Sequence, residues 1–266
     1  MESHLLLKRL DEIGQSLEQS SHALALIGLG SVGLELHRLD DYSDLDFFVI
    51  VEPGYKHSFI NDLEWLSKLC PIAYCFLNSP DGYKLLFTDG IFCEFAVFEP
   101  DELQEIPFAA GRVIWKQPHV SEAIGLPLKR SEIRSKRDQN WLVGEALTNL
   151  YVGMGREKRG ERLSATRFIQ GYAVDRLIEL VEFIEESQPV VRDEFSPERR
   201  FEQRYLKAGM QLPTWMQGYE RNRESALSIL AFLESHFDVN EIMADAVRAL
   251  CRYFATHITK LQLSNA

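Results

Sequence analysis

The sequence predicts an α+β protein with two domains, a mixed β-sheet in residues 1–127 and a bundle of helices in residues 128–266. In the first part, short apolar runs alternate with Gly, Pro and Asp, which is typical of strands joined by tight turns. In the second part, apolar residues recur at helical spacing. A chain of 266 residues is long enough to bury a core in each domain. Pro127 and the charged run after it indicate a linker between them.

The chain is expected to begin with a helix and two strands. An amphipathic helix over residues 2–19 is predicted from four apolar residues at helical spacing: Leu6, Leu10, Ile13 and Leu17. Residues 23–30 are apolar and end in glycine, which indicates a buried strand that enters a tight turn. Residues 44–51 are predicted as the second strand.

A helix and four short strands are predicted next. After a turn at residues 53–54, a helix is expected around residues 58–69. Turn residues at 80–82 and 89–90 separate the strands, which are expected at residues 72–77, 83–87, 91–98 and 112–115. This order describes a small mixed sheet and not a repeating βαβ array, in which a helix would follow each strand.

The second domain is predicted to be helical from about residue 138. Three apolar stripes at helical spacing consist of Leu147, Leu150, Tyr151 and Met154, then Ala165, Phe168, Ile169, Tyr172, Leu180 and Ile184, and finally Met243, Val247, Leu250 and Phe254. Pro213 and Gly218 interrupt the region between the last two stripes. Asn149, a polar residue beside the first stripe, is predicted to be a satisfied amide between helices.

The net charge of −11 is unevenly distributed along the chain. Residues 1–127 contain 8 Lys or Arg and 20 Asp or Glu, whereas residues 128–266 contain 21 and 20. An acidic first half argues against a nonspecific nucleic-acid-binding protein, which would show a basic stripe. It suits a metal ion or a cationic small molecule, although acidic surfaces also simply favour solubility.

Apolar runs and cysteines place the chain among soluble intracellular proteins. No apolar run approaches the ~20 residues of a membrane span, and residues 1–4 lack the basic start of a signal peptide. We therefore expect no membrane association and a cytoplasmic location. The four cysteines lie in or beside apolar runs without a paired ligand motif, and we expect buried, reduced thiols: Cys70, Cys75, Cys93 and Cys251.

A glycine-serine turn followed by two carboxylates is the most informative motif of the first domain. Gly30 lacks a side chain, so backbone N–H groups can approach a phosphate closely, and the Ser31 hydroxyl can add a donor. Asp44 and Asp46 are alternate residues of a predicted strand, so both carboxylates are expected on one face. Such a pair repels itself unless a cation bridges it, and Mg²⁺ prefers oxygen ligands together with substrate phosphates.

Glu94 is a third carboxylate that fits the same plan. It is the one acid in the apolar residues 91–98, where a charge is costly unless it is paired or faces a functional cleft. Three roles stay open for it: a general base, a third metal ligand, or a strand acid paired with a nearby Arg or Lys.

The turn, the Asp-x-Asp strand and the lone acid together resemble the DNA polymerase β-like nucleotidyltransferase superfamily. Within it the chain is similar to the small antibiotic-modifying enzymes, the aminoglycoside and especially the lincosamide nucleotidyltransferases. This closer resemblance rests on residues 42–46, the stretch around Glu94, residues 149–151 and residues 158–161. Chain length and the helical second half also match, so the resemblance covers most of the chain.

The resemblance implies transfer of a nucleoside monophosphate, with AMP as the first candidate, from an NTP to a hydroxyl of a small molecule such as an antibiotic. Residues 1–127 would be the catalytic domain, and residues 128–266 would contribute acceptor and nucleotide contacts. Asp44 and Asp46 would hold one or two Mg²⁺, and Glu94 would deprotonate the acceptor. Related antibiotic transferases are often dimers, so a homodimer is one of the states left open.

Basic residues for the nucleotide phosphates are less clear from the sequence. Members of the family commonly continue the turn with small and basic residues, whereas residues 32–37 here include the acid Glu35. The resemblance indicates Lys158 and Arg159 as phosphate contacts, against the simpler interpretation of a turn between two helices. A basic group around the predicted linker, at residues 129–137, is a second candidate.

Other interpretations of the same residues explain less. Residues 28–33 match the dinucleotide fingerprint Gly-x-Gly-x-x-Gly, but a following helix and a second parallel βα unit are not evident. The serine of this stretch is in the wrong frame for a hydrolase elbow. Two further alternatives keep the fold: AMP transfer to a protein side chain, and a catalytically silent nucleotide-binding module.

Overall fold

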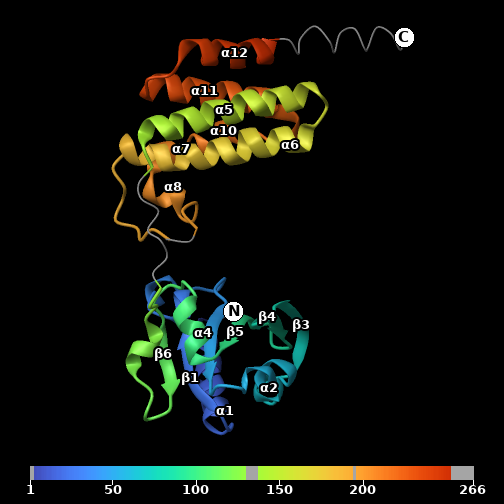
Figure 1. Cartoon of the computed structure of the whole chain (residues 1–266), viewed down its shortest axis with the longest axis vertical. Coiled ribbons are helices and arrows are strands. Elements are labelled where there is room, and N and C mark those ends of the chain that lie inside the picture. Colours follow the sequence, from blue (N-terminus) through green and yellow to red (C-terminus); the bar gives the residue numbers. More distant parts are fainter. Residues whose placement is uncertain (1–2, 130–136, 194–195, 253–266) are drawn as a thin grey trace, which may run out of the picture. The chain divides into compact units, whose positions relative to one another are not determined.

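The computed structural model describes residues 3–129, 137–193 and 196–252. The chain divides into two compact units, Met1–Glu132 and Ile133–Ala266 (Figure 1). The first contains the sheet and the second is built of helices, so the predicted α+β fold class is confirmed. Within the described residues, no helix is both long and apolar enough to cross a membrane.

The first unit contains a six-stranded mixed sheet with the strand order β3-β4-β5-β2-β1-β6. The strands are β1 (Ala23–Gly28), β2 (Leu45–Val51), β3 (Ile72–Ser79), β4 (Gly82–Phe87), β5 (Phe92–Phe98) and β6 (Arg112–Lys116). Strands β2 and β5 at the centre are parallel, and the other neighbours are antiparallel. Because β1 pairs antiparallel with both its neighbours, the stretch after it is not the parallel βα turn that a dinucleotide fingerprint requires.

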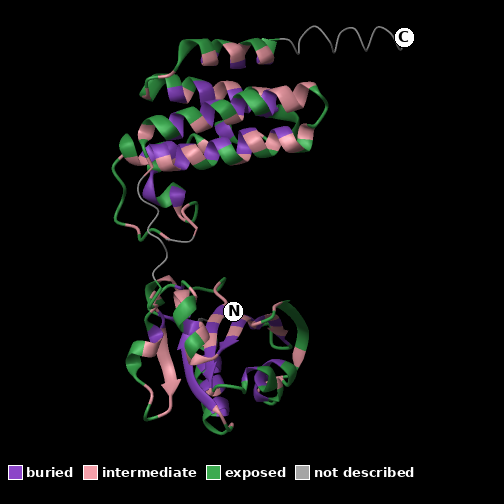
Figure 2. Ribbon diagram, in the orientation of Figure 1, coloured by how far each residue is buried: buried purple, intermediate pink, exposed green. Residues whose placement is uncertain are grey.

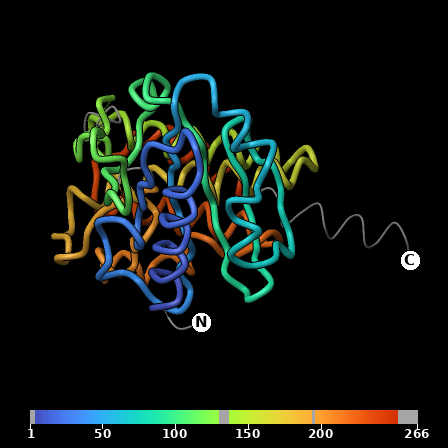
Figure 3. The backbone as a smooth tube through the Cα atoms, turned by 90° about the horizontal axis from the view of Figure 1, so that it is seen from below, coloured from blue at the N-terminus to red at the C-terminus, as the bar shows by residue number. Residues whose placement is uncertain are grey.

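The two faces of this sheet are covered differently. Helices α1 (Ser3–Glu18), α2 (Lys56–Asn61) and α3 (Glu64–Ser67) share one apolar core with Phe47 and Phe95 of the central strands. Helix α1, dark blue in Figure 3, packs on β1 and β6. The opposite face carries a smaller core that includes Ile50, Phe98 and Leu103 of α4 (Pro100–Glu105). Since residues alternate along a strand, Asp46 lies on this second face.

Strand β3 forms one edge of the sheet and differs from the central strands. Most of its residues are exposed, and it is largely green in Figure 2, where the central strands are purple. Tyr74, Phe76 and Leu77 are 57%, 52% and 47% exposed. An edge strand that exposes large apolar side chains is unusual, because such an edge can pair with another chain.

The second unit is a helical bundle around α5 (Gln139–Lys158). The other elements are α6 (Arg162–Thr166), the π-helical segment η4 (Arg167–Ala173), α7 (Val174–Leu180), η5 (Val181–Phe183), α8 (Phe201–Arg204), α9 (Leu206–Gly209), α10 (Leu212–Trp215), η6 (Tyr219–Arg221), α11 (Asn222–His236) and α12 (Glu241–Arg252). Apolar residues of the predicted stripes form its core, including Leu147, Ile169 and Val247. Phe254 of the third stripe lies outside the described residues.

Three local predictions were wrong. The helix expected at residues 58–69 is two short helices, α2 and α3, because Asp62 adopts an extended conformation between them. Asn149 donates to the Glu145 carbonyl of its own helix at 2.8 Å, and it makes no hydrogen bond to another helix among the described residues. Asp44 precedes the first residue of β2 and is not part of the strand.

Candidate active site

Asp46 and Glu94 lie directly opposite each other on the two central strands. They are Cα partners in the parallel β2–β5 ladder, and each is half-buried. Side chains of paired residues point to the same face of a sheet. Two residues that are 48 positions apart in the sequence are thereby brought side by side, on the face of the sheet that carries the smaller core.

The glycine-serine turn lies against Asp46. The Leu29 N–H donates to the Asp46 carbonyl at 2.8 Å, and the next residues form the 3₁₀ turn η1 (Gly30–Val32). Gly30 has φ +51°, and a Cβ atom built on it would lie 3.8 Å from Asp46 Oδ2. A glycine is favoured here because other residues are strained at this positive φ. The leading N–H groups of such a turn, those of Gly30 and Ser31, have no acceptor within it.

Asp44 lies at the same end of the sheet as Asp46. It is half-buried and comes one residue before the strand begins. Burial raises the pKa of the Cys93 thiol; Arg9 opposes this rise, and the nearby Asp44 and Asp46 carboxylates add to it. Both aspartates are therefore electrostatically coupled to the same buried residue of β5.

Glu94 has two side-chain partners on neighbouring strands. The Lys84 ammonium of β4 lies 3.1 Å from Glu94 Oε2, and the Asn78 amide of β3 lies 3.4 Å from Oε1. The side chains of Lys84 and Glu94 are each 43% exposed. An exposed ion pair of this kind stabilises a protein by only ~0–1 kcal/mol. The strand acid is thus paired, but the pair can open at little cost.

Arg38 is a basic residue of this site that the sequence argument missed. It belongs to the 3₁₀ turn η2 (Leu36–Arg38), and its Nη2 lies 3.7 Å from the Cβ position of Gly30. The same guanidinium donates to the Glu35 carboxylate three residues earlier, so the acid that departs from the family pattern is neutralised. Its Nε is buried and has no hydrogen-bond partner among the described residues. The spacing of Glu35 and Arg38, which suits a pair across one turn, was the available signal.

Arg112 of β6 holds the other side of the turn. Its Nη2 donates to the Val32 carbonyl at 2.9 Å and its Nε to the Gly33 carbonyl at 3.3 Å. These bonds tie the end of the turn to β6. No motif in the sequence connects residues 112 and 32, because the contact depends on the antiparallel pairing of β6 with β1.

Metal binding at this site would depend on the two aspartates. Within the described residues, no group of three or more His, Cys, Asp or Glu side chains is arranged to hold a metal ion. Mg²⁺ does not require such a group, because it is usually bound by one or two carboxylates together with substrate phosphates and water. Asp44, Asp46 and the turn beside them fit that donor set, and Glu94 as a third ligand is not needed.

Lys158 and Arg159 are neighbours in sequence but have different surroundings. Lys158 is the last residue of α5, and burial lowers the pKa of its ammonium; Cys251 opposes this effect and Arg223 adds to it. Arg159 is exposed and lies 3.5 Å from Glu161. Gly160 follows with φ +78°, as in a helix C-cap. Their phosphate role stays a prediction, and most of the basic group at residues 129–137 lies outside the described residues.

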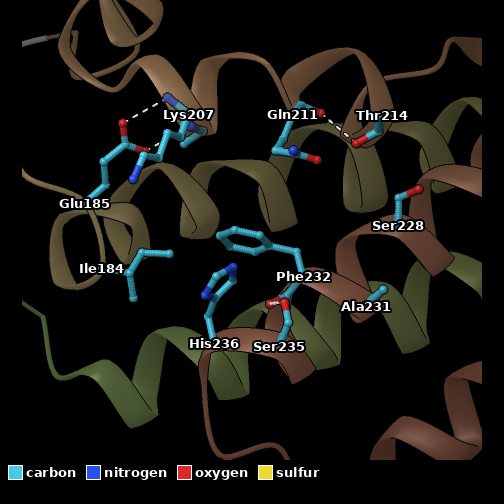
Figure 4. A pocket seen from close by; sticks show the side chains of 11 residues that line it. Ile184, Glu185, Lys207, Gln211, Thr214, Ser228, Ala231, Phe232, Ser235 and His236 are labelled. Atoms are coloured by element: carbon cyan, nitrogen blue, oxygen red, sulfur yellow. Dashed lines mark hydrogen bonds between the residues drawn. The ribbon is translucent and has the colours of Figure 1, made fainter.

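A pocket of about 640 Å³ opens in the helical unit, and none of its lining residues is a predicted site residue (Figure 4). Glu185 on its rim accepts hydrogen bonds from the N–H groups of Lys207 and Ala208, both at 2.9 Å. The rings of Phe232 and His236 lie close together, 4.8 Å between centroids. The carboxylate is occupied by the backbone, so the polar side chains at this pocket include no acid placed for chemistry.

Comparisons with known proteins give matches in structure only. No protein-family model and no curated protein matches the sequence significantly. An aminoglycoside 6-adenyltransferase from Bacillus subtilis matches 97% of this chain and 97% of its own, with 14% identity and a TM-score of 0.34. A STING-associated CdnE c-di-GMP synthase from Capnocytophaga granulosa matches 98% of this chain and 82% of its own, with 12% identity and a TM-score of 0.33. Both TM-scores are below 0.5, so no residue role is taken from either protein.

Proposed function

We propose that this protein is a nucleotidyltransferase that moves a nucleoside monophosphate, with AMP as the first candidate, from an NTP to a hydroxyl of a small molecule. The observation that carries the proposal is the direct pairing of Asp46 with Glu94 beside the Gly30 turn. One carboxylate lies next to a turn suited to phosphate, and the other faces the same space from the neighbouring strand. This arrangement provides one group for the donor and one for the acceptor.

In the proposed reaction the acceptor oxygen attacks the α-phosphorus, and the bond from that phosphorus to the pyrophosphate oxygen breaks. Glu94 takes the proton of the acceptor hydroxyl, after its contact with Lys84 opens. Gly30, Ser31 and Arg38 contact the outgoing phosphates, which leave as pyrophosphate. Positioning and charge neutralisation supply most of the rate, as is usual in phosphoryl transfer.

Asp44 and Asp46 would hold Mg²⁺ together with the phosphates. When bound, the ion would polarise the phosphoryl oxygens and screen the developing charge. The two carboxylates lie at the start of β2 next to the Gly30 turn, so they would hold the ion beside the residues proposed to contact the phosphates.

Replacing Asp46 tests the proposal most directly. Asp46→Asn should reduce transfer from labelled ATP to below detection and leave the melting temperature nearly unchanged, because a half-exposed acid beside another is not a source of stability. Asp11→Asn, at an exposed position of α1, is the matched control and should keep full activity. The acceptor panel should contain streptomycin, lincomycin and AMP.

Two results would count against the proposal. If Asp46→Asn transfers AMP as well as the wild type, the site lies elsewhere. If it unfolds outright while Asp11→Asn does not, Asp46 is a structural residue.

A further inference from the structure

Strand β3 places two exposed aromatic side chains on the face of the sheet that carries the candidate active site. Phe76 is the partner of Lys84, Lys84 of Glu94, and Glu94 of Asp46. One row of side chains therefore runs across four strands from Phe76 to Asp46. Tyr74 lies two residues from Phe76 and so belongs to the same face.

A hydrogen bond independently supports this continuity. Asn78, two residues beyond Phe76 on β3, reaches across β4 to Glu94, with 3.4 Å between its Nδ2 and Oε1. Side chains of β3 on this face thus come within reach of the proposed acceptor base. Neighbouring strands are about 4.8 Å apart, so Phe76 lies about 10 Å from Glu94 along the row.

The two rings are available for a ligand. Tyr74 is 57% exposed and Phe76 is 52% exposed, and neither takes part in a ring contact among the described residues. By contrast, Phe47, Phe95 and Tyr83 stack on one another on the opposite face. Exposed aromatic side chains beside polar groups mark binding surfaces more often than single exposed aliphatic residues do.

We propose that Tyr74 and Phe76 form the acceptor platform of the enzyme and select acceptors with a flat aromatic ring. The ring would stack on the two side chains while a hydroxyl, about two strand spacings away, reaches Glu94. Lys84 lies between these points, so an anionic or hydrogen-bond-accepting group is favoured in the middle of the ligand and a cation is not. AMP combines a flat ring, hydroxyls and an anionic phosphate in one small molecule, and it therefore serves as the probe. The inference rests on the function proposed above, whose acceptor it specifies.

The test is a calorimetric titration of AMP into the full chain, saturated beforehand with Mg²⁺ and a non-hydrolysable ATP analogue that fills the donor site. Phe76→Ala and Tyr74→Ala should each weaken AMP binding about tenfold, the usual effect of losing one stacked ring. Phe76→Tyr should retain the affinity. Leu77→Ala is the matched control, because Leu77 is the neighbouring residue of β3, is 47% exposed and points to the opposite face.

Three results would overturn the platform: no AMP binding by the wild type at millimolar concentration, equal affinity in wild type and both aromatic variants, or an equal loss in Leu77→Ala. A fourth overturning result would come from light scattering. If the wild type is a dimer and all three alanine variants are monomers, β3 pairs with a second copy of the chain.

A parallel assay of AMP transfer from labelled ATP separates this inference from the proposed function. Ring-dependent AMP binding without transfer to AMP, streptomycin or lincomycin would leave the platform standing and count against the transferase proposal. AMP transfer that depends on neither ring would support the transferase proposal and overturn the platform.

Discussion

Two glutamates, one in each unit, show how differently the chain uses an acid within a regular element. Glu157 in α5 is only 8% exposed, and it accepts hydrogen bonds from Arg162 Nε at 3.1 Å and from Asn222 Nδ2 at 2.9 Å. Glu94 in β5 is 43% exposed and has one lysine and one long amide contact. Glu157 is fixed by its hydrogen bonds with neighbouring side chains, whereas Glu94 remains accessible to a ligand.

The same contrast extends to the polar groups around each acid. In the helical unit, the buried Gln170 of η4 donates to Asn222 Oδ1 at 2.7 Å and accepts from the Gly218 N–H at 2.8 Å. These residues satisfy one another and link the π-helical segment to α11. In the sheet unit, Arg38 Nη2 and Asp46 Oδ2 lie 3.7 and 3.8 Å from the Cβ position of Gly30, beside a turn whose first N–H groups have no acceptor within it. A self-satisfied network stabilises a fold, whereas N–H groups of this kind suit an anionic ligand.

Removing the divalent metal should have the largest effect on transfer activity. We expect this effect to arise in the sheet unit alone. ATP is expected to raise the melting temperature of the protein with Mg²⁺ and to have no effect in EDTA, because Asp44 and Asp46 would repel a triphosphate. Transfer should stop completely in EDTA and recover when Mg²⁺ is restored. Equal stabilisation by ATP in both buffers would exclude these aspartates as metal ligands.

Glu94→Gln should have the next largest effect. A general base contributes about 10²–10⁴-fold, so kcat should fall by that amount while Mg²⁺–ATP binding and the melting temperature stay near those of the wild type. Glu18→Gln, at an exposed position of α1, is the control. Loss of metal and nucleotide affinity together would make Glu94 a third ligand, and full activity would remove it from the mechanism.

Glu157→Ala should show the opposite pattern. It leaves Asn222 without one acceptor and breaks the pair with Arg162 in a buried position, so the free energy of unfolding should fall by about 1–3 kcal/mol. Denaturant unfolding measures this loss. The folded fraction should keep its transfer rate. A stable variant with no activity would mean that the helical unit contributes an acid to the reaction.

Much of the sheet unit was predictable, because period-2 patterns and turn residues define strands locally. The strands beginning at Ala23 and Arg112 lie where the sequence placed them. Strand neighbours were not predictable, and the pairing of Asp46 with Glu94 depends on them. For the same reason the contact of Arg112 with Val32 and the place of Phe76 in the same row became visible only in three dimensions. Local spacing shows that an acid interrupts an apolar strand, but it does not show which lysine lies opposite.

The smallest effect on AMP affinity and transfer is expected from chemical modification of β3 on the face opposite the candidate site. Cys75 is exposed and pairs with Leu85, so it points to the face opposite Phe76. Burial raises the pKa of its thiol and raises that of Cys251 in the helical unit to about 11, so thiolate at either position is scarce near neutral pH. Cys93 and Cys251 are buried and Cys70 is half-buried, so iodoacetamide at pH 8.5 should label the exposed Cys75 first.

Labelling of Cys75 should leave both AMP affinity and transfer within about twofold of the untreated protein, because it adds bulk only on the face that lacks the carboxylates. Mass spectrometry confirms the labelled position, and Cys75→Ser, which should be inert to the reagent, is the control. If the labelled protein loses transfer while Cys75→Ser keeps it, ligand contacts reach around the edge of β3. The proposal that only one face of β3 contacts the ligand would then be wrong.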